Sequence, residues 1–158
     1  KGAIDGVYLS QPVIDDNGVV GQVMEVGSTN SRVLLIADVT HAIPVRSLRN
    51  DIRFIATGSG AINELYLEHV PHSVDIVEGD TLISSGLGKV FPEGYPVAKV
   101  TQVIRDESRP FARVIATPLA NLDRLRHLLL LWHTQENQNK ADESENGNDE
   151  DVEGANDA

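Results

Sequence analysis

Turn-forming residues interrupt this sequence every eight to twelve residues, and this spacing limits what the chain can fold into. Short runs of valine, isoleucine, leucine and threonine, which favour strands, stand between the interruptions. Evenly spaced short strands of this kind are typical of a β-sandwich or a β-barrel. No stretch of ten or more residues carries a clear helical periodicity. The sequence therefore predicts an all-β fold, and because only 4% of the residues are aromatic, its core is expected to be aliphatic.

Several segments predict individual strands. Asn17-Gly18 stands between two apolar segments and predicts a hairpin with a type I′ turn, which needs positive φ at both central residues. Residues 33–37 are apolar on both alternating phases, so we expect a strand that is buried on both faces. Leu65 and Leu67 alternate with polar residues, which predicts a half-solvated strand. Later strands are expected at 81–84, 96–104 and 111–117, and a short helical turn from Leu122 is expected to precede a closing strand over Leu128–Trp132.

Two small β-barrel-like subdomains and a tail are the expected domain organisation. The first subdomain would cover residues 1–50 and the second 51–133, with strands exchanged between them if the barrels interlock. Residues 134–158 hold nine acidic groups and one lysine, and their net charge of −8 accounts for most of the −11 of the whole chain. Such a polar segment buries too little apolar surface to offset its ordering entropy. We therefore expect 134–158 to be a disordered acidic tail.

Composition excludes several classes of function. The chain has no cysteine, so it can form neither a disulfide nor a thiolate metal site. The nearly neutral body lacks the clustered Lys and Arg that bind nucleic acid, and no nucleic-acid partner is expected. No window approaches the roughly 20 apolar residues that span a bilayer. Because the chain starts at Lys1 and not at Met, we interpret it as a fragment or a processed chain.

A serine hydrolase of the chymotrypsin type is the enzyme alternative, because that fold is also built from two small β-barrels. Asp38, His41 and either Ser84 or Ser85 supply the residue types of its triad. However, Asp38 and His41 are too close in sequence to lie on separate elements, and a Gly-Asp-Ser-Gly-Gly loop is missing. An Asp and a His at a strand end are more often turn residues. We therefore predict no catalytic residue and no enzyme.

Histidine and glycine motifs do not predict a metal or a cofactor. His69 and His72 flank Val70-Pro71. Because Pro71 disfavours a helix at the residue before it, the two histidines do not form a zinc-binding pair on one helical face, and they are interpreted as loop residues. Gly86 and Gly88 match neither a dinucleotide fingerprint nor a phosphate loop. Their expected role is to let two backbones approach closely.

A loop rich in glycine and proline stands out between Gly79 and Val97. Its prolines and glycines stiffen the backbone, and it holds two of the chain's six Phe and Tyr residues, Phe91 and Tyr95. A stiff loop that presents aromatic side chains loses little entropy on binding, so both are predicted to contact a partner. The alternative for Phe91 is that its ring is buried and fills one end of a barrel. Tyr66 is a third candidate contact, and the predicted turn and loop positions are Asn17, Gly18, Gly79, Asp80, Gly86, Gly88, Pro92, Gly94 and Pro96.

Five stretches occur in the order found in one protein family. They are Gly18–Val23, Ser31–Ile36, His41–Val45, the run Gly79–Val97 with its Ser84-Ser85-Gly86-Leu87-Gly88 and Phe91-Pro92-Glu93-Gly94-Tyr95-Pro96-Val97 segments, and Leu122–Leu125. In these stretches the sequence resembles MreC, the rod-shape-determining family of bacteria, and the resemblance covers essentially all of 2–132. Arg49–Arg53 and Leu128–Trp132 resemble the proteobacterial members.

The resemblance implies a non-enzymatic scaffold at the periplasmic face of the bacterial inner membrane. Members of the family have an inner-membrane helix, a periplasmic coiled coil and a C-terminal pair of small β-barrels, and this chain would be the β region alone. The resemblance also implies binding and activation of the elongation transpeptidase, penicillin-binding protein 2, in a complex with RodA, MreD, MreB and RodZ. A peptidoglycan-binding module is the other alternative that stays open.

Self-association into dimers or filaments is a further property that the resemblance implies. A strand at a sheet edge could pair with a neighbouring copy, and 62–68 is the candidate edge. Glu64 and Glu68 would then act as charges that guard this edge against unwanted pairing.

Overall fold

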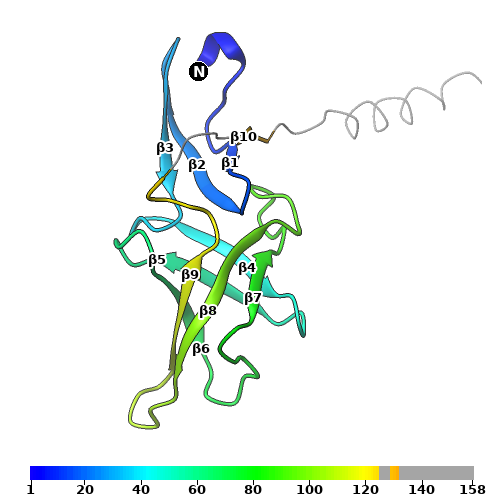
Figure 1. The fold of residues 1–158 in the computed structure, drawn as a ribbon, viewed down its shortest axis with the longest axis vertical. Helices are drawn as coiled ribbons and strands as arrows, with labels where there is room; N and C mark the ends of the chain where they lie inside the picture. Colours follow the sequence, from blue (N-terminus) through cyan, green and yellow to red (C-terminus); the bar gives the residue numbers. More distant parts are fainter. Residues whose placement is uncertain (125–128, 132–158) are drawn as a thin grey trace, which may run out of the picture.

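The computed structural model describes residues 1–124 and 129–131, and there the regular structure is almost entirely β (Figure 1). The single short 3-10 helix is η1 (Ala3–Asp5). The prediction of an all-β fold is confirmed. In this part of the chain the structure has no helix of the length and apolarity that a membrane crossing requires. The strands are β1 (Pro12–Ile14), β2 (Val19–Val26), β3 (Ser31–Leu35), β4 (Ala42–Ser47), β5 (Arg53–Gly58), β6 (Leu65–Val70), β7 (Thr81–Ser84), β8 (Pro96–Ile104), β9 (Ala112–Pro118) and β10 (Leu129–Leu130).

The strands form two antiparallel arrangements that lie one above the other in Figure 1. The lower one is a closed barrel in the order β4-β5-β6-β9-β8-β7, and the upper one is a four-stranded sheet in the order β10-β1-β2-β3. Strand pairing therefore changes between β3 and β4, earlier than the boundary expected at residue 50. The closing strand expected near the end of the body is β10, which returns to the first sheet and pairs Leu130 with Val13 of β1.

One apolar core joins the sheet and the barrel. Valines dominate the sheet's share, and Phe54 and Phe91 are the only aromatic residues among the buried members. The expected aliphatic core is thus present, and the two arrangements share it. Members from the sheet include Val13, Val20 and Val23, and members from the barrel include Val45, Leu65 and Val100.

Two expectations about strand burial need correction. The segment 33–37 is not a strand buried on both faces, because among the described strands β3 pairs with β2 alone, and its apolar side chains are only half-buried. Ile36 and Ala37, which follow the strand, are the buried residues of that run. The alternation of Leu65 and Leu67 is confirmed, since both are buried. However, β6 is not an edge strand, because it pairs with both β5 and β9.

The hairpin at Asn17-Gly18 is confirmed, but its turn type is not. Neither residue has positive φ, so the turn is not type I′. The Asp15 carboxylate instead accepts hydrogen bonds from the backbone N–H groups of Asn17 (2.8 Å) and Gly18 (2.9 Å). Gly18 is required for another reason: a Cβ atom there would lie 2.6 Å from the Pro96 carbonyl oxygen at the start of β8. This glycine lets the sheet pack directly against the barrel.

Two sequence predictions fall partly or wholly outside the described residues. The helical turn expected from Leu122 runs into 125–128, and the acidic tail 134–158 follows the last described residue.

Candidate functional site

Ser84 holds the conspicuous loop between β7 and β8 in shape. Its Oγ donates to the Pro92 carbonyl (2.5 Å) and accepts a hydrogen bond from the Tyr95 N–H (2.9 Å). Its own carbonyl accepts from the Gly94 N–H at 2.9 Å. These bonds join the two ends of the loop, so its stiffness comes from a buried serine as well as from its prolines and glycines. Because the hydroxyl is already engaged, Ser84 is a structural residue here.

Phe91 occupies the interior and not the surface. Its side chain is 4% exposed, and its ring meets the His41 ring edge to face with centroids 5.9 Å apart. The expectation that Phe91 is presented to a partner is therefore overturned in favour of the alternative that it plugs the core. A large aromatic ring gains more by burial in the apolar core than by exposure.

Tyr95 and Tyr66, the other two aromatic candidates, are half-buried. Tyr95 packs against the core at the end of the loop. Tyr66 lies on β6, where the Arg113 guanidinium stands 5.4 Å from its ring centroid and its hydroxyl donates to Glu64 at 3.3 Å. Each tyrosine keeps part of its ring at the surface, so each stays a candidate contact. The structure places them on separate elements.

The loop glycines have left-handed backbone conformations, and at Gly86 a close contact adds to this, because a Cβ there would lie 3.2 Å from Glu93 Cβ. Gly86 and Gly88 have φ of 78° and 77°, and a Cβ at Gly88 would meet nothing within 4 Å. The expectation of closely approaching backbones is thus wrong for Gly88. Gly79 and Gly94 also have positive φ, in line with the turns predicted there.

Asp80 forms a buried junction at the start of β7. Its carboxylate accepts hydrogen bonds from the Val77 N–H (3.1 Å) and from Arg49 Nε (2.8 Å). The Arg49 hydrogen bond is the largest influence that holds the pKa of Asp80 below its usual range. Arg49 also pairs with Asp75 at 3.0 Å, so one guanidinium joins two acidic residues of the 71–80 segment.

The Asp, His and Ser residues that a serine hydrolase would need do not form a hydrogen-bonded triad. Asp38 Oδ1 accepts from the Thr40 N–H (2.9 Å) and Thr40 Oγ1 (2.7 Å), and these bonds lower its pKa, the backbone bond most. Burial lowers the pKa of His41 to about 4, and neither ring nitrogen bonds to any described residue. Ser84 is engaged as described above, and Ser85 Oγ accepts from the Leu87 N–H. The interpretation of Asp38 as a turn residue is confirmed.

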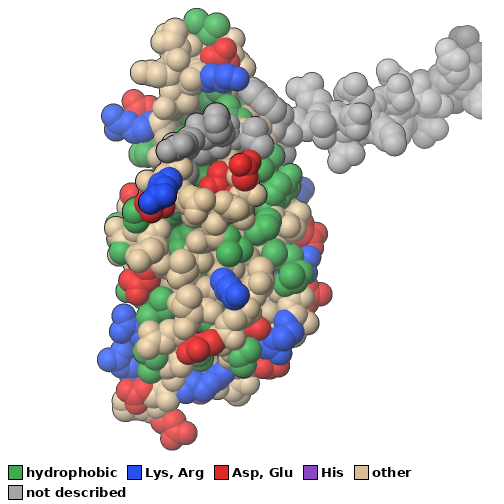
Figure 2. All heavy atoms as spheres, viewed as in Figure 1, with side chains coloured by type: hydrophobic (Ala, Val, Ile, Leu, Met, Phe, Trp, Pro, Cys, Tyr) green, Lys and Arg blue, Asp and Glu red, His purple; other side chains and the backbone are tan. Residues whose placement is uncertain are grey.

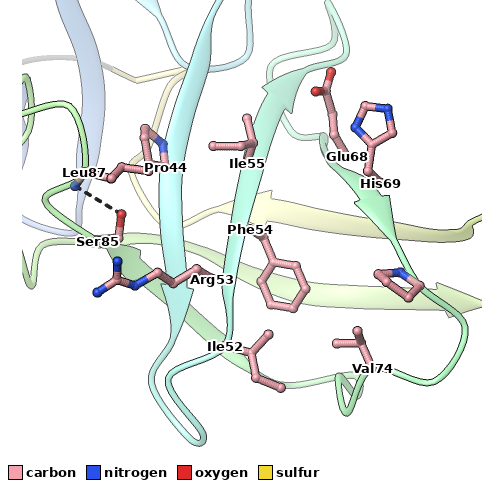
Figure 3. A pocket seen from close by; sticks show the side chains of 11 residues that line it. Pro44, Ile52, Arg53, Phe54, Ile55, Glu68, His69, Val74, Ser85 and Leu87 are labelled. Carbon is pink, nitrogen blue, oxygen red and sulfur yellow. Dashed lines mark hydrogen bonds between the residues drawn. The ribbon is translucent and has the colours of Figure 1, made fainter.

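A groove of about 360 Å³ lies on the barrel where β5 and β6 separate (Figure 3). The register between these strands ends at Ala56–Leu67, and β6 then bulges before Val70 pairs with β9. Most of the lining is apolar, and Arg53 and Glu68 stand on opposite sides of it in Figure 3. The apolar lining residues are Pro44, Ile52, Phe54, Ile55, Pro71, Val74 and Leu87.

Two walls of the groove are held in place in different ways: the β6 wall carries a strained residue, and the wall at Val74 is fixed by hydrogen bonds. His69, in the bulge of β6, has a φ of 52°, which is unfavourable for a residue with a side chain and is often found at binding sites. Its ring meets Phe111 edge to face at 5.1 Å. Arg105 donates to the carbonyls of Val74 (2.9 Å) and Ile76 (3.1 Å), which fixes the segment that carries the lower wall. The groove is therefore largely preformed.

The sequence did hold a signal for this groove. Arg53 and Thr57 mark the outward phase of β5, and Ile55 is a large apolar residue on that same phase. Leu87 also lines the groove, and 55% of its surface is exposed there, which only the structure shows. His69 lines the groove, but the described residues contain no group of three His, Cys, Asp or Glu that could hold a metal ion.

The surface shows mixed charge. On the face in Figure 2, acidic and basic side chains are interspersed over the barrel, and neither sign forms a continuous field. An apolar groove in such a surface is a more distinctive feature than any charged patch on that face.

The comparisons with known proteins identify the family. The family model described as rod shape-determining protein MreC, barrel core, matches residues 1–132. This chain belongs to the MreC family. A cell shape-determining protein MreC from Haemophilus influenzae is 60% identical over 132 residues, which are 84% of this chain and 38% of that relative. The chain thus spans well under half the length of this curated MreC relative.

Solved MreC structures share the fold. The crystal structure of MreC from Pseudomonas aeruginosa is 52% identical with a TM-score of 0.81, and the match covers 84% of this chain and 85% of that one. Two more distant matches show the fold alone. One is the major periplasmic domain of the cell shape-determining filament MreC (20% identity, TM-score 0.61, 75% and 74% covered). The other is MreC in a complex with penicillin-binding protein 2 from Helicobacter pylori (22% identity, TM-score 0.61, 75% and 74% covered).

Proposed function

We propose that this MreC chain is a non-enzymatic scaffold of cell elongation, and that its β5–β6 groove docks penicillin-binding protein 2. The observation that carries the proposal is a preformed apolar groove that stays open to solvent on an otherwise well-packed barrel. Exposed apolar surface of this kind marks a contact with another protein. The Helicobacter pylori complex supports the choice of partner, because the MreC in it has the same fold.

Rigidity makes the groove suitable for docking. Ser84 fixes the loop that carries Leu87, and Arg105 fixes the segment that carries Val74. A preformed site binds with little further loss of conformational entropy, so more of its contact energy contributes to affinity. Arg53 and Glu68 form no ion pair with a described residue and would orient the partner by charge.

Activation would follow from selective binding. If the groove binds an open conformer of the transpeptidase more tightly than the closed one, binding shifts the population toward the active state. The work would take place at the periplasmic face of the inner membrane, with RodA, MreD, MreB and RodZ in the same complex and with self-association of the scaffold. The periplasmic domain of the distant MreC structure supports this location.

Catalysis is not part of the proposal. A serine hydrolase needs a hydroxyl bonded to its histidine base, whereas Ser84 Oγ donates to the Pro92 carbonyl and His41 is buried against Phe91. Labelling of Ser84 or Ser85 by a serine-directed probe would revive the hydrolase alternative. Binding of the chain to isolated sacculi would revive the peptidoglycan-binding alternative.

Leu87→Lys tests the groove directly. Leu87 is exposed, so a lysine there keeps the fold but places a charge in the apolar lining. We expect capture of the purified transpeptidase to weaken about tenfold or more, because a desolvated charge costs more than 1.4 kcal/mol. Val39→Lys is the matched control, since Val39 is 66% exposed and lies outside the groove lining. Equal capture by the two variants would reject the groove.

The half-buried tyrosines can be compared in the same capture experiment. Tyr95→Ala and Tyr66→Ala each remove a ring that keeps part of its surface exposed. A loss of capture with either variant, at unchanged unfolding temperature, would extend the docking surface to that tyrosine.

A further inference from the structure

The turn between β1 and β2 joins an exposed asparagine to a buried glycine. Asn17 is exposed and Gly18 is buried, and neither residue has the positive φ that a type I′ turn would need. The pair therefore does not serve the turn type for which the sequence suggests it. Because glycine has no Cβ, its backbone nitrogen can approach the side chain of the residue before it more easily than that of any other residue. An exposed Asn-Gly pair is for this reason a place where a chain can modify itself.

The modification needs no reactant besides water and hydroxide. The Gly18 backbone nitrogen loses its proton to hydroxide and attacks Cγ of the Asn17 side chain. A new C–N bond closes a succinimide ring, the Cγ–Nδ2 bond breaks, and the departing group takes up a proton and leaves as ammonia. Water then opens the ring at either carbonyl carbon. Opening at Cγ leaves an aspartate, whereas opening at the main-chain carbonyl leaves an isoaspartate, whose main chain is longer by a methylene group.

Asp15 restrains the nitrogen that would attack. Its Oδ1 accepts hydrogen bonds from the Gly18 N–H (2.9 Å) and the Asn17 N–H (2.8 Å), and its own N–H donates to the Gly18 carbonyl at 3.0 Å. Loss of the Gly18 proton would leave two negative charges only 2.9 Å apart, which is unfavourable. Gly18 also lies close to the barrel, since a Cβ there would be 2.6 Å from the Pro96 carbonyl oxygen. The attack must therefore wait for a local opening of the turn.

We propose that Asn17 is a site of spontaneous deamidation that Asp15 holds back, and that the isoaspartate product loosens the contact between the sheet and the barrel. Asp15 Oδ2 also accepts the Asn121 N–H at 2.9 Å, so one carboxylate ties the β1–β2 turn to the segment that follows β9. An isoaspartate at position 17 lengthens this turn. It also places a second carboxylate near Asp15, and the two like charges repel.

Incubation of the purified chain in mildly alkaline buffer tests the site, with peptide mapping by mass spectrometry to separate the asparaginyl, aspartyl and isoaspartyl forms. We expect Asn17 to react about tenfold or more slowly in the native chain than in guanidinium chloride, because a hydrogen bond to a charged group must first break. Asn146-Gly147, the other Asn-Gly pair of the sequence, is the reference in the unfolded chain and should react there at a similar rate. Equal native and unfolded rates at Asn17, or no reaction in either state, would overturn the proposal.

Substitution of Asp15 tests the restraint itself. Asp15→Ala should raise the native rate at Asn17 about tenfold or more, and Asp16→Ala is the matched control, because Asp16 is the exposed acidic neighbour. Asp15→Asn keeps the shape of the side chain and a neutral acceptor, so it should fold like the unmodified chain and raise the rate less. An unchanged rate in both variants would overturn the restraint. A slower reaction would overturn it as well, because Asp15 would then be the base that removes the proton.

The effect of the product is measured on the isoaspartyl chain, which its extra negative charge separates from the unmodified chain by ion exchange. We expect lower hydrogen-exchange protection of the Asn121 amide, which donates to Asp15, and unchanged protection of the Tyr95 amide, which donates to Ser84. Asn17→Asp is the control that adds the charge without lengthening the main chain, and its loss of protection should be smaller. Full protection of the Asn121 amide in the isoaspartyl chain would overturn the proposed loosening.

Discussion

The barrel and the four-stranded sheet are built from similar short strands, yet they offer different surfaces to a partner. β4 to β9 close on themselves, so the barrel is left with side-chain surfaces, and its distinctive one is the groove where β5 and β6 separate. Among the described strands the sheet does not close, and β3 and β10 are its two outer strands. Closure thus decides whether an antiparallel structure meets a partner through side chains or through its backbone.

The two regions nevertheless depend on each other, because they share one core. Phe91 comes from the loop between β7 and β8, and it contacts His41, which lies where the chain passes from the sheet to the barrel. A change at this contact should therefore affect the whole molecule, whereas a change at the groove should affect only the contact with a partner.

Phe91→Ala has the largest expected effect. The ring is 4% exposed, and its removal should lower the free energy of unfolding by about 3–5 kcal/mol, the usual cost of deleting a buried phenylalanine. Urea unfolding followed by circular dichroism measures the loss. We expect one shared transition, shifted to lower urea. Two separated transitions, with only one of them shifted, would show that the sheet and the barrel fold independently.

The buried His41 should make stability depend on pH in a defined window. Burial holds its pKa at about 4, against 6.5 for an unperturbed histidine, so the unfolded chain binds more protons between these values. Stability should therefore fall as the pH drops from 6.5 toward 4, by up to about 3 kcal/mol. The carboxylates with lowered pKa (Asp38, Asp75, Asp80 and Asp106) act below this window.

His41→Leu isolates that contribution, because leucine keeps an apolar side chain beside Phe91 and cannot be protonated. The difference in unfolding free energy between the variant and the unmodified chain should be constant above pH 7 and should grow as the pH drops toward 4. A difference that does not change with pH would show that His41 stays accessible to protons in the folded chain.

Sequence reasoning found the strands well because their positions depend on local patterns. The alternation of Leu65 and Leu67, the hairpin after Ile14 and the strands from Thr81 onward all follow from neighbouring residues. The order in which strands pair depends on contacts between residues that are far apart in sequence. For that reason the sequence predicts a central strand at 33–37 and an edge strand at 62–68, the reverse of the topology of the described strands.

The candidate site was less accessible to sequence reasoning. Phe91 and Tyr95 stood out because aromatic residues are scarce, but the sequence could not show which side of the loop faces the core. The groove depends on where β5 and β6 stop pairing, which is a property of the assembled barrel. Ile55 was its one local signal, an apolar residue on an outward phase.

Gly18 and Gly88 give the finest test of the relation between the two regions, because their roles are the opposite of those that the sequence predicts. A methyl group at Gly18 would lie 2.6 Å from the Pro96 carbonyl and would push the sheet from the barrel, so Gly18→Ala should cost about 1–3 kcal/mol. Gly88→Ala has free space but must keep a φ of 77°, which costs about 1 kcal/mol. Gly88 lies outside the contact between the sheet and the barrel. Only Gly18→Ala should therefore also reduce the amide-exchange protection of the strands on both sides of that contact. If the two variants changed stability and protection alike, backbone conformation and not close packing would explain both glycines.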